Sequence, residues 1–150
     1  MSGADDWPFS VVDRVRFGDL DAMQHLNNVE FLRFFETARI AYISELFPEH
    51  SPASPDRGVF GFIFAECHIA YRAPAHYDED VRTFVRVGET KRSSVKLDFE
   101  MRRDGDDRLL AEGWGTLVGY DYAAGESRPL PDALRDRLGR ELGIGSGGDG

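Results

Sequence analysis

The sequence predicts an α+β fold in which an antiparallel five-stranded sheet wraps around one long central helix. Three observations support this prediction. A stretch of about 20 residues is apolar on most of the circumference that it would have as a helix. One stretch before it and several stretches after it show the two-residue period of strands. Turn-forming residues separate the later stretches, so neighbouring strands are expected to run antiparallel.

The first strand is expected at residues 9–17, FSVVDRVRF, where apolar and polar residues partly alternate. Gly18 ends this pattern, and residues 18–28 are expected to form a loop because they favour turns and helix caps. A helix is predicted at residues 28–47, with a length of about 30 Å. Its apolar side chains are Phe31, Phe34, Phe35, Ala38, Ala41, Tyr42, Ile43 and Leu46. Because this stripe is wider than that of a surface helix, the helix is expected to be largely buried.

Residues 48–58 contain three of the seven prolines and are expected to form a loop. Strands are then predicted at 59–72, 79–88, 93–103 and 108–122. The sequences GETKR and RDGDD interrupt the period and predict hairpin turns. A short helix is expected at 131–142, followed by a flexible tail at 143–150. Residues 1–142 are therefore expected to form one domain.

The composition is that of a globular protein, with 41% hydrophobic and 30% charged residues in a chain of 150. A net charge of −9 repels a phosphate backbone, so nucleic acid is not an expected partner. The chain shows neither the apolar run of a membrane span nor the starting pattern of a signal peptide. The single cysteine, Cys67, excludes an internal disulfide and fits a reducing compartment. We therefore expect a cytoplasmic protein with no membrane association.

The expected sheet would be incomplete in a single copy of the chain. Five strands and one helix leave one sheet edge unpaired and one sheet face half covered. Natural proteins usually cover such surfaces, often with a second copy of the same chain. A homodimer or homotetramer is therefore expected.

The loop before the long helix contains the side chains best suited to chemistry, which are Asp19, Asp21, His25, Asn27 and Asn28. A helix start presents unpaired backbone N–H groups and a partial positive charge, which stabilise an anion or a developing oxyanion. A carboxylate nearby can act as a nucleophile or as a base for water. These two parts suffice for acyl transfer. The same residue types also cap helices and close turns, and on spacing alone that structural interpretation is the more common one.

Residues 17–39, FGDLDAMQHLNNVEFLRFFETAR, resemble the signature of hot-dog thioesterases of the 4-hydroxybenzoyl-CoA thioesterase family. Members share an aromatic residue at a strand end, two acidic residues spaced by one, and a helix with an acidic residue and an arginine three positions on. Here these residues are Phe17, Asp19, Asp21, Glu36 and Arg39. The stretch DLDAMQHLNNV also resembles the plant acyl-carrier-protein thioesterases, and residues 68–87 resemble a strand, turn and strand of the first family. The resemblance implies the hot-dog fold and thioester hydrolysis.

The resemblance also implies roles for single residues. Asp21 would be the catalytic carboxylate, acting as nucleophile or as general base. The backbone N–H of Asn28 would polarise the thioester carbonyl, while His25 and Asn27 would orient substrate or water. The plant enzymes have an Asn where this chain has Met23, so a mechanism that needs that amide cannot operate here. Asn28 replaces an aromatic residue of the 4-hydroxybenzoyl enzyme, which leaves a backbone role intact.

The turn of Lys91, Arg92 and Ser93 is the candidate site for phosphate groups. In the 4-hydroxybenzoyl enzyme a similar basic stretch after the same strand holds the phosphates of coenzyme A. The resemblance therefore implies that this turn binds the nucleotide part of the substrate through its positive charges. Charged turns are also normal on hairpins, and that alternative stays open. A structural role is expected for four other candidates, which are Glu36, Glu66, Cys67 and His68.

The expected function is hydrolysis of an acyl-CoA thioester, with coenzyme A as part of the substrate and no metal or redox cofactor. Alternatives on the same fold are an acyl-carrier-protein thioesterase, an enoyl-thioester hydratase and a non-catalytic acyl-CoA-binding protein. Hydratases of this kind have their Asp five residues before their His, with Asn and Pro between, whereas Asp21 and His25 are four apart without a Pro. The acyl group cannot be read from the sequence, since the candidate lining residues could equally be core. These are Phe31, Phe34, Phe35, Phe60, Phe62 and Phe64.

Overall fold

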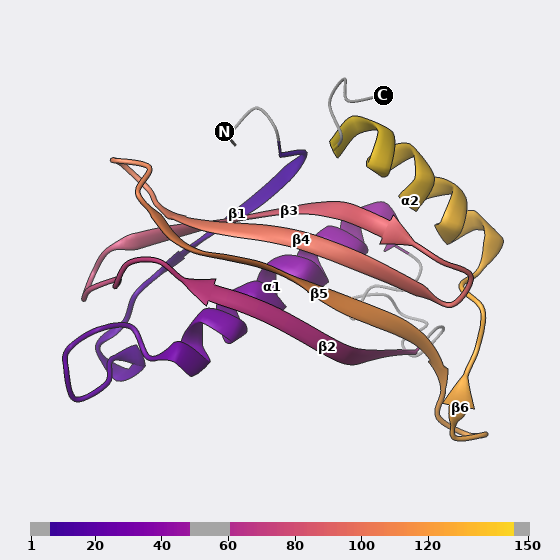
Figure 1. Cartoon of the computed structure of the whole chain (residues 1–150), viewed down its shortest axis with the longest axis horizontal. Helices are drawn as coiled ribbons and strands as arrows, with labels where there is room; N and C mark the ends of the chain where they lie inside the picture. Colours follow the sequence, from indigo (N-terminus) through magenta and orange to yellow (C-terminus); the bar gives the residue numbers. More distant parts are fainter. Residues whose placement is uncertain (1–6, 49–60, 146–150) are drawn as a thin grey trace.

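The computed structural model describes residues 7–48 and 61–145. Figure 1 shows a curved sheet lying across one long helix, with a second helix near one end of the sheet. The elements in chain order are β1 (Phe9–Arg14), the short 3-10 helix η2 (Phe17–Asp19), α1 (Asn28–Leu46), β2 (Phe62–Tyr71), β3 (Asp80–Thr90), β4 (Ser94–Arg103), β5 (Leu109–Asp121), β6 (Glu126–Ser127) and α2 (Asp132–Gly145). The predicted α+β class, with an antiparallel sheet around a long helix, is confirmed.

The sheet has the strand order β1-β3-β4-β5-β2, and all of these pairs are antiparallel. β3, β4 and β5 follow one another through short turns at GETKR and RDGDD, where hairpins were predicted. β1 and β2 form the two edges, and each pairs with a strand far away in the sequence. The two-residue strand β6 pairs with the end of β5 and was not predicted, because two residues carry no readable period. The predicted loop at 48–58 lies almost entirely outside the described residues.

The core lies between α1 and the inner face of the sheet. Phe35 of α1 stacks on Phe99 of β4 with ring centroids 4.1 Å apart, and Phe9 of β1 stacks on Tyr42 at 5.1 Å. The buried residues of the helix are Phe31, Phe34, Phe35, Ala38, Tyr42 and Ile43. The buried residues of β4 are Val95, Leu97, Phe99, Glu100 and Met101, of which the apolar ones alternate along the strand. The expectation of a largely buried helix is therefore confirmed.

The second helix, α2, completes this core at the end of the sheet away from the start of α1 (Figure 1). Leu134 and Leu138 are fully buried in the core cluster. The Tyr42 hydroxyl donates a hydrogen bond to Glu141 at 2.6 Å, and burial together with this bond raises the pKa of Tyr42 well above its usual value. Tyr42 therefore remains a hydrogen-bond donor that ties α1 to α2. The helix continues to Gly145, beyond the predicted end at residue 142.

The edge strand β2 is far more exposed than the strands in the middle of the sheet. Residues 64–68 are all exposed, so side chains on both faces of this strand contact solvent. Within the described residues β2 has β5 as its one strand neighbour, and a bulge between Phe64 and Glu66 interrupts their register. This is the kind of unpaired edge that natural proteins cover.

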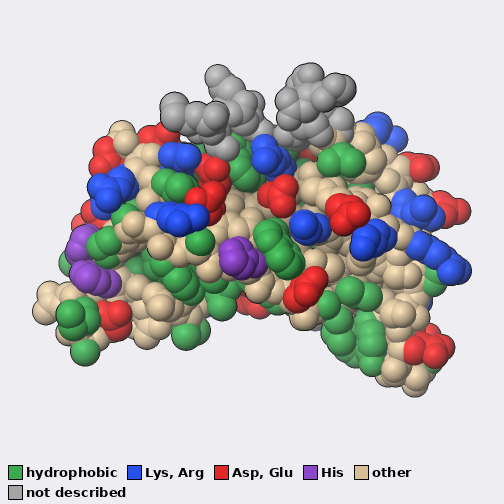
Figure 2. Space-filling model, in the orientation of Figure 1, with side chains coloured by type: hydrophobic (Ala, Val, Ile, Leu, Met, Phe, Trp, Pro, Cys, Tyr) green, Lys and Arg blue, Asp and Glu red, His purple; other side chains and the backbone are tan. Residues whose placement is uncertain are grey.

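Figure 2 shows the side of the sheet that faces away from α1, where acidic and basic side chains are interleaved. Several of them form ion pairs across neighbouring strands or along one strand. Arg72 lies 3.0 Å from Glu112, and Arg102 lies 2.9 Å from Glu100. This face is therefore polar, in contrast to the apolar inner face. In the part of the chain that the structure describes, no helix has the length and apolarity needed to cross a membrane.

Candidate functional site

The loop between η2 and α1 closes on itself and forms a compact unit. Leu20 and Leu26 form an antiparallel bridge at its base. Inside it, the N–H of Asp21 donates to the His25 carbonyl at 2.9 Å, and the N–H of Gln24 donates to the Asp21 carbonyl at 2.9 Å. Gln24 sits at the tip with φ of 64°, in the left-handed region. Because the loop satisfies its own backbone groups, it can hold side chains in fixed positions.

The Asp21 carboxylate is held by this loop and still has one oxygen available. Its Oδ1 accepts hydrogen bonds from the N–H groups of Met23 at 2.9 Å and His25 at 3.1 Å. Among the described residues, none donates a hydrogen bond to Oδ2. Asp21 also lines an open pocket of about 550 Å³, together with Phe17, Leu20, Ala22, Gln24 and Tyr77. A fixed carboxylate with a free oxygen beside a pocket can act as a base or a nucleophile.

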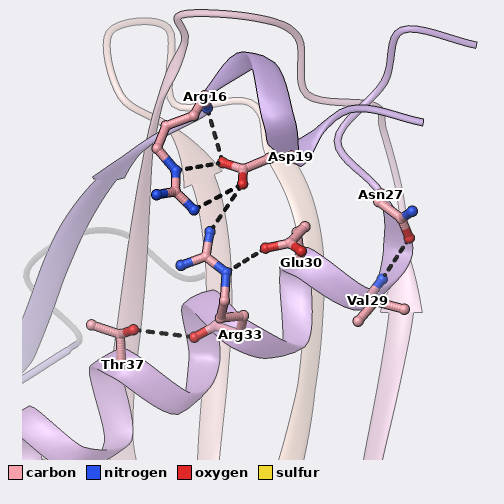
Figure 3. Close-up of polar contacts among 7 residues, drawn as sticks. All are labelled: Arg16, Asp19, Asn27, Val29, Glu30, Arg33 and Thr37. Carbon is pink, nitrogen blue, oxygen red and sulfur yellow. Dashed lines mark hydrogen bonds and ion pairs between the residues drawn. The ribbon is translucent and has the colours of Figure 1, made fainter. Parts of the chain in front are cut away.

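The start of α1 leaves one backbone donor unused. Asn27 is the N-cap, and its Oδ1 accepts the N–H of Val29 at 3.0 Å (Figure 3). The N–H of Asn28 forms no hydrogen bond with any residue in the described ranges. The Asn28 carbonyl accepts the hydroxyl of Tyr71, at the end of β2, at 3.1 Å. The helix start is thus anchored to the sheet while a donor at its positive end stays open.

Asp19 has a structural position, in contrast to Asp21. Its side chain is 3% exposed, and Figure 3 shows it between two guanidinium groups. It accepts the N–H of Arg16 at 2.9 Å, and its Oδ1 lies 3.1 Å from the Arg16 side chain and 3.2 Å from that of Arg33. Arg33 also pairs with Glu30, and the Asn27 N–H donates to the Asp19 carbonyl at 2.9 Å. Asp19 therefore fastens the loop to α1.

The environment of Asp19 favours its charged form. Burial by itself raises the pKa of this carboxyl, but the hydrogen bonds and charge of Arg16, with the charge of Arg33, hold it below its usual range. A carboxyl with a lowered pKa stabilises the fold above its unfolded-state pKa, and this contribution is lost as the pH falls through the folded-state pKa.

We expect Asp19→Asn to lower the free energy of unfolding by about 2 kcal/mol at pH 7, because charge-assisted hydrogen bonds are lost. The difference from wild type should shrink as the pH falls below about 4 and through the lowered folded-state pKa, where the wild-type carboxyl becomes protonated too. Urea denaturation at a series of pH values measures this. The matched control is Asp78→Asn, whose carboxylate is exposed and lies 3.7 Å from Arg14. A constant difference for Asp19→Asn at every pH would contradict this account.

The structure adds a second histidine that the sequence did not reveal. The rings of His25 and His76 are in edge-to-face contact, with centroids 5.2 Å apart and planes at 90°. His76 lies in the turn between β2 and β3, and its neighbour Tyr77 lines the Asp21 pocket. Figure 2 shows histidine side chains gathered at the end of the molecule where this loop lies. No local pattern marked His76, because the contact joins distant parts of the chain.

The weaker candidates lie away from Asp21 or form structural contacts. Glu36 is exposed and lies 3.6 Å from Arg39, a contact that fits the structural role expected for it. Burial raises the pKa of Cys67, while the charge of Arg39 acts in the opposite direction, so its environment does not favour a thiolate. His68 stacks on Trp114 with centroids 6.0 Å apart. In the described residues, no group of three or more His, Cys, Asp or Glu side chains could hold a metal ion.

The turn of Lys91, Arg92 and Ser93 is not near Asp21 within one chain. It connects β3 to β4 at the end of the sheet opposite the loop before α1 (Figure 1). Strand β3 has 11 residues, so the two ends lie roughly 35 Å apart. Of the phenylalanines considered for an acyl pocket, Phe31, Phe34 and Phe35 are buried in the core. Phe60 lies outside the described residues.

The family comparison matches most of the chain. A family model described as the thioesterase-like superfamily matches residues 15–138. The search of curated protein sequences returned no match.

Solved structures resemble the whole described fold. A thioesterase from Thermus thermophilus, complexed with coenzyme A and Zn, is 32% identical with a TM-score of 0.77, and the match covers 93% of this chain and 97% of that chain. A thioesterase superfamily protein from a Jannaschia species is 28% identical with a TM-score of 0.79, over 91% of this chain and 84% of that chain. A Staphylococcus aureus protein in complex with CoA is 12% identical with a TM-score of 0.82, over 95% and 89%, which is a likeness of fold alone.

Proposed function

Because this chain belongs to the thioesterase-like superfamily and has the hot-dog fold, we propose that it hydrolyses an acyl-CoA thioester to a free acid and coenzyme A. The observation that carries the proposal is the junction of loop and helix. There a carboxylate with a free oxygen, on Asp21, and an unused backbone donor, on Asn28, lie at the two ends of one hydrogen-bonded loop. The complex of the Thermus thermophilus relative with coenzyme A supports coenzyme A as the thiol carrier.

In the proposed reaction Asp21 acts as a general base. Its free oxygen takes a proton from water while the water oxygen bonds to the thioester carbonyl carbon. The carbonyl oxygen becomes an oxyanion that accepts a hydrogen bond from the Asn28 N–H. The carbon–sulfur bond then breaks, the acyl group leaves as the acid, and the thiolate takes up the proton. In the alternative form, Asp21 attacks the carbonyl carbon, the carbon–sulfur bond breaks and coenzyme A leaves as the thiolate, and water then hydrolyses the resulting anhydride.

The other loop residues have supporting roles in this proposal. Asn27 caps the helix and so keeps the Asn28 N–H pointed out of the helix end. The imidazole of His25 orients the attacking water or the thioester. Phe17 and Tyr77 provide the apolar wall of the pocket beside the carboxylate.

The test of the proposed oxyanion donor is Asn28→Pro compared with Asn28→Ala. Proline removes the N–H but suits the first helical position, and Asn27 already has the ψ of 139° that a residue before proline prefers. We expect Asn28→Pro to lower kcat about 100-fold with an unchanged melting temperature, and Asn28→Ala to keep near wild-type kcat. If both variants hydrolyse acyl-CoA like wild type, the backbone donor has no role.

We further propose that the chain acts as a homodimer or a larger assembly in which β2 strands of two copies pair. The argument rests on what lies at each end of β2. Its last residue, Tyr71, contacts Asn28 at the helix start. Its first residue, Phe62, lies opposite Gly119, whose N–H donates to the Ser93 carbonyl at 2.8 Å.

When the β2 strands of two copies pair antiparallel about a twofold axis, the first residue of one β2 lies beside the last residue of the other. The turn that contains the partner subunit's Lys91 and Arg92 then lies at the same end of the joined sheet as Asn28. This arrangement supports Lys91, Arg92 and Ser93 as ligands of the coenzyme A phosphates, for a substrate whose thioester lies at the other subunit's Asp21. Within one chain the basic turn and Asp21 lie roughly 35 Å apart, and this pairing brings the turn of one copy to the end of the sheet where the other copy's Asp21 lies.

A further inference from the structure

The turn between β2 and β3 supports the candidate loop through three consecutive residues. The Ala75 carbonyl accepts the N–H of Leu26 at 2.8 Å. The ring of His76 contacts that of His25, and the ring of Tyr77 contacts that of Phe17 edge to face at 6.3 Å. Phe17, His76 and Tyr77 are exposed, so these aromatic pairs add little to the core. Because three consecutive residues of this turn each contact the segment around Asp21, the turn can fix the shape of that segment.

His76 is itself held in place from its other side. Its N–H donates to Glu79 Oε1 at 2.7 Å, and its ring Nδ1 lies 3.6 Å from the same oxygen. The second oxygen of Glu79 lies 3.1 Å from Arg103, on β4. The series Arg103, Glu79, His76 and His25 thus runs from the rigid sheet to the loop. Its last member donates its backbone N–H to the Asp21 carboxylate.

We propose that His76 is a positioning residue, whose ring holds the His25 imidazole in the orientation that thioester hydrolysis at Asp21 requires. Glu79 fixes His76 in turn, because its carboxylate accepts the His76 N–H and lies against the ring Nδ1. An edge-to-face contact restricts the neighbouring ring more than a solvent-exposed position does. This inference rests on the proposed function, since it assigns His76 a part in the same reaction.

The test compares His76→Ala and His76→Phe with wild type. We expect His76→Ala to shift and broaden the imidazole NMR signals of His25 and to lower kcat about 10-fold, with KM within about 2-fold, since small misplacements of catalytic groups are costly. His76→Phe keeps an aromatic ring against His25, so it should recover most of the kcat. The melting temperature is measured for each variant, so that loss of folding is seen directly.

The matched control is His68→Ala, which removes another partly packed histidine ring, one that stacks on Trp114. It should leave the His25 signals unchanged; kcat is not part of this control, because His68 lies on β2, the strand proposed to pair two copies. Unchanged His25 signals in His76→Ala, or an unchanged kcat, would overturn the proposal. If wild type hydrolyses no acyl thioester, the proposed function fails and the catalytic part of this inference fails with it. The NMR signals then still decide whether His76 orients His25.

Discussion

Asp21→Asn is expected to lower kcat for acyl-CoA hydrolysis about 1,000-fold, because the amide is neither a base nor a nucleophile. The amide oxygen can still accept the N–H groups of Met23 and His25, so the loop should keep its shape. KM should change little. The measurement is release of free thiol from short, long and aromatic acyl-CoAs, with wild type and variant in parallel. The best wild-type substrate also identifies the acyl class.

The chain contains a close structural match for the control. Asp121 Oδ1 accepts the N–H groups of Ala123 at 3.0 Å and Ala124 at 3.1 Å, so it closes its own turn as Asp21 does. Asp121→Asn removes the same charge from the same kind of turn and should leave kcat unchanged. Turnover that survives in Asp21→Asn would remove Asp21 from the mechanism and move attention to Glu36 or His25. Binding of acyl-CoA without turnover by wild type would favour the non-catalytic alternative.

Gly113→Ala is expected to have the largest effect on stability, a loss of about 3 kcal/mol or more. Gly113 of β5 lies opposite Ile69 of β2, and a Cβ there would overlap the His68 carbonyl oxygen, with the carbonyl carbon at 2.9 Å. Since the obstacle is backbone, β2 must separate from β5 to make room. Urea denaturation measures the loss.

The same variant tests the proposed assembly. Wild type should sediment as a multiple of the 16.9 kDa chain, whereas Gly113→Ala should lose this assembly together with the displaced β2. The control is Gly139→Ala in α2, where an added Cβ meets nothing within 4 Å. It should raise stability by about 0.5–1 kcal/mol, as expected for a helical glycine. Wild-type stability in Gly113→Ala would show that the two strands can separate locally without loss.

Much of the fold could be predicted because its signals are local. The apolar circumference of α1 and the alternating residues of β3 to β5 follow from neighbours along the chain. The predicted ends of the helices and strands were less accurate. The first strand was expected to reach residue 17 but ends at Arg14, because the chain then turns into η2. The packing of α2 on α1 through Tyr42 and Glu141 joins distant residues and left no pattern in the sequence.

The residues of the candidate site also fall into those marked by a local motif and those defined only by contacts between distant parts of the chain. Asp21, Asn27 and Asn28 could be named as candidates from the sequence because they form one contiguous motif before a helix. His76 could not be named from the sequence, because it comes from a different turn and contacts His25 only in the folded chain. Asp19 belonged to the motif, but its burial between Arg16 and Arg33 distinguishes it from Asp21 only in the folded chain.

The strand order has a consequence for how the chain folds. β3, β4 and β5 are joined by short turns, so they close small loops and can pair early. β1 and β2 must each find a partner far along the chain, which is entropically slower. The loop with Asp21 lies between β1 and α1 and rests on the turn after β2. We therefore expect refolding to restore the central hairpins before the loop, so that regained structure precedes regained activity.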